Sequence, residues 1–161
     1  MNILIIGASR GIGLEFVRQY AHAGSLTPPT QETFDAVMHA NVLGAMQVIP
    51  QVAPLVEEAS GKFAFISSEM GCITEVPSSS SWTYRVSKAA LNMAVQSARF
   101  DYQKAHFMAL SPGWVQTDMG GAGAPLTVEI SVQQMRQTIA KTKSQDANVF
   151  WHPDGKHFKG W

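Results

Sequence analysis

Short apolar runs alternate along the chain with longer stretches in which apolar residues recur every three or four positions. The short runs predict buried strands of a parallel sheet at residues 3–6, 62–68, 106–110 and 149–151. The periodic stretches predict helices after residue 13, from Thr30, over 84–103 and from Thr127. This alternation indicates an α/β fold with a parallel sheet.

Two helices allow predictions about ends and faces. The helix from Thr30 should be kinked or ended by Pro50 or Pro54, since proline removes a backbone donor. The helix over 84–103 should pack through its small and apolar residues, namely Val86, Ala90, Met93, Ala94 and Ala98.

Composition narrows the class of protein. The 161 residues suffice for one domain with a real core, so we expect a single domain over 1–161. Apolar residues make up 45% and charged residues 15%, and the formal net charge is zero without any long basic run. Binding to nucleic acid or to a membrane surface therefore has no electrostatic support. The single cysteine, Cys72, and the lack of a signal-like N-terminus favour a cytoplasmic protein.

A glycine-rich turn follows the first predicted strand. Gly7, Gly11 and Gly13 stand between the run 3–6 and a helical pattern, which is the context of a dinucleotide-binding loop. Glycines let the backbone approach a pyrophosphate, and the helix N-terminus offers free N–H groups. A plain strand-to-helix turn is the less favoured alternative.

Tyr84 and Lys88 form the main candidate for chemistry. In a helix their spacing of four places them on one face, where the ammonium would favour the phenolate and lower the pKa of Tyr84. An ordinary exposed pair is the default interpretation of this pattern alone. Ser67 and Ser68 end the strand at 62–68, at the sheet edge where α/β proteins carry their sites, although such serines are often turn formers.

These motifs together resemble the short-chain dehydrogenase/reductase family. The glycine turn resembles its cofactor loop and Tyr84-x-x-x-Lys88 its catalytic pair, in the family's order. The segment 111–121 is similar to the C-factor and Sniffer-type carbonyl reductase branch. The resemblance implies a Rossmann-like, doubly wound parallel sheet.

The resemblance also implies a function, which is the NAD(P)(H)-dependent interconversion of a small carbonyl compound and its alcohol. Tyr84 would be the general acid/base, Lys88 would lower its pKa and bind the nicotinamide ribose, and Ser68 rather than Ser67 would polarise the carbonyl. Asn41 would kink its helix and support a proton relay, although a satisfied helix asparagine is the alternative. The implied cofactor-binding residues are Gly7, Ser9, Arg10, Gly11, Ile12, Gly13, Asn41, Tyr84, Lys88, Pro112, Gly113, Val115 and Thr117.

Further implications concern the cofactor, partners and metals. Arg10 could meet a 2′-phosphate, so NADP(H) is favoured over NAD(H). Family members often pair through the helix that here covers 84–103, which allows a homodimer. The five histidines show no metal-binding spacing, so we predict no metal site.

One part of the family pattern is absent. About two strand–helix units are missing near residues 24–27, where the chain passes from the first helix directly to the helix at Thr30. The chain could therefore be a remnant without catalysis that pairs only its remaining strands and acts as an interaction or regulatory protein. It is equally open that the missing segment belongs to the protein but not to this sequence.

Overall fold

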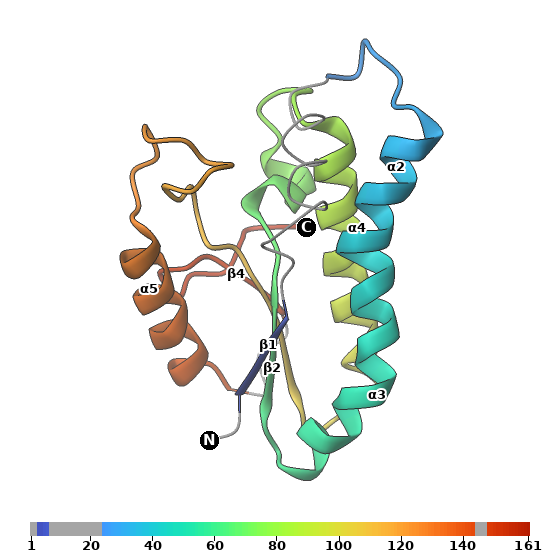
Figure 1. The fold of residues 1–161 in the computed structure, drawn as a ribbon. Helices are drawn as coiled ribbons and strands as arrows, with labels where there is room; N and C mark the ends of the chain where they lie inside the picture. Colours follow the sequence, from blue (N-terminus) through green and yellow to red (C-terminus); the bar gives the residue numbers. More distant parts are fainter. Residues whose placement is uncertain (1–2, 7–23, 144–147) are drawn as a thin grey trace.

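A four-stranded parallel sheet forms the centre of the computed structural model, which describes residues 3–6, 24–143 and 148–161. Its strands are β1 (Ile3–Ile6), β2 (Lys62–Ile66), β3 (His106–Leu110) and β4 (Phe150–Trp151), side by side in chain order (Figure 1). All four predicted strands are confirmed, although β2 ends before the two serines and β4 is one residue shorter. The predicted α/β fold with a Rossmann-like parallel sheet is also confirmed.

Strand β1 pairs directly with β2. Ile3 lies opposite Lys62, and Lys62 in turn lies opposite His106 on β3. The strands on either side of the absent units are therefore hydrogen-bonded to each other with no gap between them. Because all pairs are parallel, the chain leaves β1, β2 and β3 at the same edge of the sheet.

Helices cover both faces of the sheet (Figure 1). On one face lie α2 (Gln31–Met38), a π-helical turn (His39–Leu43), α3 (Gly44–Glu58) and α4 (Trp82–Ala98). On the other face lies α5 (Val128–Lys141). Two short 3₁₀ turns, Glu69–Gly71 and Ile73–Glu75, connect β2 to α4. Thr30 and Thr127 cap α2 and α5 through their hydroxyls, as their sequence context predicts.

The core has two layers because side chains alternate across a strand. Phe63, Phe65 and Phe107 are buried against α3 and α4 in the larger layer. Ala64 and Met108 point to the opposite face, where Ile139 of α5 covers them. The hydrophobic pattern of the strands therefore fixes which helices can cover each face.

The prediction that Pro50 or Pro54 would end the helix from Thr30 is wrong, while the alternative that they kink it stays a prediction. Helix α3 runs through both prolines to Glu58. Both prolines are exposed, so the carbonyls that they leave unpaired can face water, while Ile49 and Ala53 pack into the core. The helix changes instead at the π-helical turn, which contains Asn41.

The predicted packing face of the helix over 84–103 is wrong for Val86 and Met93, whereas Ala98 does pack against the core. Helix α4 ends at Ala98, and Val86 and Met93 are exposed by 42% and 62%. The buried face carries Ser87, Lys88, Leu91, Asn92 and Val95. Three of these five side chains are polar, so the apolar pattern alone cannot identify the face.

Candidate active site

The candidate site is built where β2 and β3 end beside α4. The backbone N–H of Ser67 donates to Leu110 O at 2.7 Å, and that of Ser111 donates to Trp151 O at 2.9 Å. These bonds extend the sheet by one residue beyond the strands. They bring the segment after β2 and the segment after β3 together at the carboxyl edge, which is the usual place for a site in an open α/β sheet.

Tyr84 and Ser68 meet at this edge. The Ser68 side chain lies close enough to the Tyr84 phenol to lower its pKa by hydrogen bonding. Ser68 also begins the turn Glu69–Gly71, because its Oγ accepts from the N–H of Met70 at 3.2 Å. The structure therefore brings together the two hydroxyls that the sequence resemblance pairs.

The pKa of Tyr84 differs from the sequence expectation. Burial raises the pKa above its ordinary value of 10.0, and the hydrogen bond to Ser68 offsets only part of this rise. The expected lowering by Lys88 is therefore not a property of the site as it stands. The phenol is protonated at neutral pH and can donate a proton.

Lys88 lies one helical turn after Tyr84 and is almost fully buried. Its Nζ donates to Ile66 O at 3.1 Å and lies 5.5 Å from the centroid of the Tyr84 ring. Burial lowers the pKa of Lys88 to about 8. An ammonium has three donors, so this buried group can still bind the hydroxyls of a sugar, which fits the expected nicotinamide ribose.

Asn41 is tied to the same helix. It lies in the π-helical turn between α2 and α3, and its Nδ2 donates to Ser87 Oγ at 3.0 Å. Ser87 Oγ in turn donates to the backbone O of Tyr84 at 2.8 Å. The predicted helix irregularity at Asn41 is present, and π-helical turns are frequent at functional sites.

Ser67 and Ser68 have different surroundings. Ser67 is buried and its Oγ donates to Asn92 Oδ1 at 2.5 Å, one turn beyond Lys88 on α4. Ser67 therefore anchors the end of β2, while Ser68 is the hydroxyl that faces Tyr84.

The segment after β3 carries the remaining described candidates. Gly113 has a φ of +75°, which favours glycine, and Pro112 O accepts from Ser131 Oγ at 2.7 Å. Val115 is buried, and Thr117 Oγ1 accepts from the N–H of Gly120 at 3.1 Å. The other predicted cofactor residues, Gly7, Ser9, Arg10, Gly11, Ile12 and Gly13, lie outside the described residues.

Three positioning contacts were not found from the sequence. Ser87 links Asn41 to Tyr84, Asn92 holds Ser67, and Ser111 accepts from the N–H groups of Glu69 and Gly113. Only Ser111 carries a sequence signal, since it directly precedes the Pro-Gly turn. Ser87 and Asn92 resemble ordinary polar helix residues until the packing of α4 is known.

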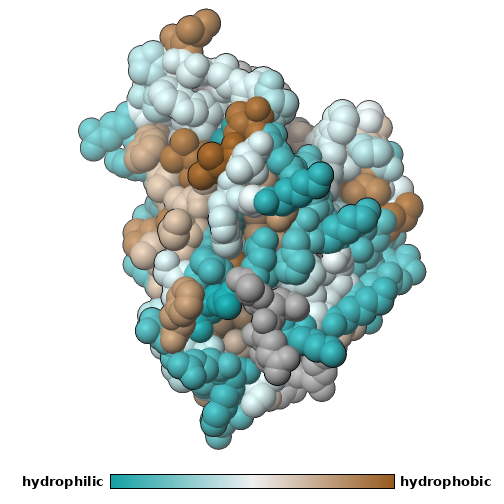
Figure 2. All heavy atoms as spheres, turned by 180° about the vertical axis from the view of Figure 1, so that it is seen from behind, coloured by the Kyte–Doolittle hydropathy of each residue, from teal (hydrophilic) through white to brown (hydrophobic). Residues whose placement is uncertain are grey.

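An open groove of about 600 Å³ lies near the site. Met70, Trp82 and Arg85, which come shortly after Ser68 or close to Tyr84 in the chain, are among its lining residues, although neither catalytic candidate lines it. On the face seen in Figure 2, the most hydrophobic residues gather in the upper half of the molecule.

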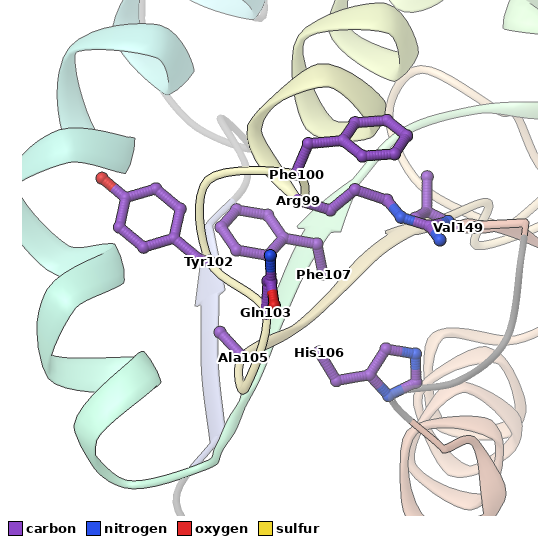
Figure 3. A pocket seen from close by; sticks show the side chains of 8 residues that line it. All are labelled: Arg99, Phe100, Tyr102, Gln103, Ala105, His106, Phe107 and Val149. Carbon is purple, nitrogen blue, oxygen red and sulfur yellow. The ribbon is translucent and has the colours of Figure 1, made fainter.

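A smaller hollow of about 240 Å³ lies near the opposite end of β3, lined by Arg99, Tyr102 and Phe107 among others (Figure 3). It is remote from Ser68 and is not part of this site.

Other classes of site find no support in the described part of the chain. Residues 3–6, 24–143 and 148–161 contain no cluster of three potential metal ligands. Within the same residues, no helix has the length and apolar character needed to cross a bilayer.

Known proteins resemble this chain in both sequence and fold. C-signal of Myxococcus xanthus is 37% identical over 118 residues, which are 71% of each protein. The carbonyl reductase Sniffer of D. melanogaster has a TM-score of 0.83 at 29% identity, covering 99% of this chain and 66% of that one. A short-chain dehydrogenase/reductase from Burkholderia multivorans, solved with bound NADP, has a TM-score of 0.80 at 25% identity, covering 96% and 64%.

The chain spans about two thirds of the two solved chains, whereas C-signal is of similar length to it. The family model described as short chain dehydrogenase matches residues 25–125, which include Asn41, Ser68, Tyr84 and Lys88. On these grounds, the chain belongs to the short-chain dehydrogenase/reductase family.

Proposed function

We propose that the protein is an NAD(P)(H)-dependent oxidoreductase that interconverts a carbonyl compound and an alcohol, with Tyr84 as general acid/base. The observation that carries this proposal is the buried Lys88 ammonium, 5.5 Å from the centroid of the Tyr84 ring, at the end of β2 where Ser68 approaches the phenol. The family of the chain and the carbonyl reductase Sniffer as a structural neighbour support the reaction class.

The nicotinamide cofactor would supply or accept the hydride. In carbonyl reduction, Tyr84 donates its phenolic proton to the substrate oxygen, and Ser68 holds that oxygen by a hydrogen bond. Lys88 binds the ribose and compensates the negative charge that forms on the phenolate. Asn41 supports the return of a proton to Tyr84.

The preference for NADP(H) over NAD(H) is part of this proposal. Arg10 would meet the 2′-phosphate, and Gly7, Ser9, Gly11, Ile12 and Gly13 would surround the pyrophosphate. Pro112, Gly113, Val115 and Thr117 would contact the nicotinamide end. The neighbour with bound NADP supports this choice. A cytoplasmic location, suggested by the lone Cys72, also belongs to the proposal.

The first prediction tests the role of Tyr84. Tyr84→Phe should lower the rate of NADPH oxidation with 4-nitrobenzaldehyde by about 10² to 10⁴-fold, because it removes the proton donor while keeping the ring. The absorbance of NADPH measures the rate. Tyr102→Phe is the matched control, since Tyr102 packs on Phe107 away from Ser68 and should retain its activity. Equal rates for both variants would contradict the proposal.

A second function is favoured by one relative. The match to C-signal covers 71% of this chain and 71% of C-signal, so the two proteins are of similar length. The name of that relative indicates a signalling role. On this alternative the chain is a remnant that acts through interactions and binds no dinucleotide. Titration of the protein with NADPH, followed by cofactor fluorescence, separates the two functions, because saturable binding supports the oxidoreductase and its absence supports the remnant.

A further inference from the structure

We propose that Ser111 is a positioning residue whose side chain holds the turn carrying Ser68 within reach of Tyr84. This inference rests on the proposed function, because it concerns the hydroxyl that would hold the substrate oxygen. It adds a residue that directly follows β3, whereas Ser68 follows β2.

The hydroxyl of Ser111 connects two segments of the site. Ser111 is fully buried directly after β3, and its Oγ accepts from Glu69 N at 3.0 Å and from Gly113 N at 3.1 Å. A hydroxyl oxygen has two acceptor positions, so both are used. One bond reaches the residue after Ser68, and the other reaches the Pro-Gly turn.

Ser68 is held from both sides. On the preceding side, Ser67 is fixed through its N–H to Leu110 O and through its Oγ to Asn92. On the following side, the bond from Glu69 N to Ser111 is the contact that ties the turn to β3. The turn itself depends on Ser68, whose Oγ accepts from Met70 N. Loss of the Ser111 hydroxyl therefore removes the hydrogen bond between the turn and the segment after β3, while Gly71 still packs against the backbone of α4.

The expected effect of Ser111→Ala is a loss of turnover through misplacement of Ser68. The variant leaves two N–H groups without their acceptor, and the turn must shift to find other partners. A displacement near 1 Å can cost about 10²-fold in rate. We expect kcat for 4-nitrobenzaldehyde reduction to fall about 10- to 100-fold.

A double-mutant cycle separates positioning from general destabilisation. If Ser111 acts through Ser68, then Ser111→Ala should lower kcat in the wild-type chain but change it by no more than about twofold in the Ser68→Ala background. Thr142→Val is the matched control, because it also removes a buried hydroxyl that donates a hydrogen bond, here to Ile139 O beside Lys62 at the start of β2 rather than at its carboxyl end. It should retain its kcat.

Amide hydrogen exchange gives a readout that needs no turnover. In Ser111→Ala the amides of Glu69 and Gly113 should exchange about tenfold faster than in the wild-type chain, while those of the strands keep their protection. Unchanged exchange at both amides, or equal losses of kcat in the two backgrounds, would overturn the inference. A wild-type chain without any turnover would instead overturn the proposed function, which the cycle detects in its first measurement.

Discussion

At the scale of single residues, the site depends on polar groups buried beside a sheet. Tyr84 and Lys88 both carry pKa values displaced by burial, upward for the phenol and downward for the amine. Each shift favours the neutral form. At neutral pH the site therefore holds a phenol that can donate a proton beside an ammonium whose charge is made costly by burial. The energetic cost of charging Lys88 can be measured.

Because charging the buried Lys88 is costly, we predict that the free energy of unfolding depends on pH. The pKa of Lys88 is about 8 in the folded chain, against an ordinary value of 10.5. Between these values the unfolded chain holds a proton that the folded chain lacks, so the free energy of unfolding rises with pH. From pH 8 to 9.5 the wild-type chain should gain about 1 to 2 kcal/mol relative to Lys88→Met.

Urea unfolding at several pH values in this window measures the difference. Tyr84 does not interfere, because its raised pKa lies above the window. A difference between the two proteins that stays constant or falls from pH 8 to 9.5 would show that Lys88 is not buried as an amine of low pKa.

At the scale of elements, the sequence predicted strands better than helices. β3 has the predicted bounds, because an apolar run buried on both faces has few alternatives. Pro50 was misleading because proline breaks helices only where its neighbours cannot adapt, and here it faces solvent. The face of α4 was misplaced because Ser87 and Asn92 are buried through hydrogen bonds that connect distant parts of the chain. Such contacts cannot be read from local periodicity.

The site residues also divide into those that local motifs indicate and those whose role only the fold shows. Ser68, Tyr84 and Lys88 were predictable because their motifs are local and their order along the chain is characteristic. Ser111 and Asn92 act through partners 42 and 25 residues away, so only the fold shows what they hold. The placement of Arg10 stays a prediction, because it lies outside the described residues.

The misplaced face of α4 leads to a prediction about association. Val86 and Met93 lie two turns apart on α4 and are exposed, as is Met46 on the neighbouring α3. The family resemblance implies pairing through this helix, and burial of these side chains would drive it. Light scattering should give twice the chain mass of 17.5 kDa for the wild-type protein and the single mass for Met93→Glu. Val128→Glu on α5 is the control and should retain the dimer. A monomeric wild-type chain would contradict this prediction.

At the scale of the whole molecule, a sheet of four strands keeps the site together although the chain spans only about two thirds of its solved neighbours. Direct pairing of β1 with β2 closes the sheet where the family pattern has further strands. It also brings Ile6, the last residue of β1, to the edge of the sheet where Ser67 follows β2. That the chain forms one domain with a deletion near residues 24–27 stays a prediction. The proposal that the protein is a carbonyl oxidoreductase can nevertheless be tested with the chain of 161 residues.

The most direct test is the transfer of deuterium from NADPH labelled at both C4 positions to 4-nitrobenzaldehyde, followed by mass spectrometry of the alcohol. On the proposed mechanism, the carbonyl carbon would accept the deuteride as the cofactor is oxidised to NADP⁺, and Tyr84 would supply the proton to the oxygen. We predict one deuterium per molecule of 4-nitrobenzyl alcohol with the wild-type chain, and at least about 100-fold less labelled product with Tyr84→Phe. Absence of labelled alcohol from the wild-type chain, or equal amounts from both proteins, would contradict the account.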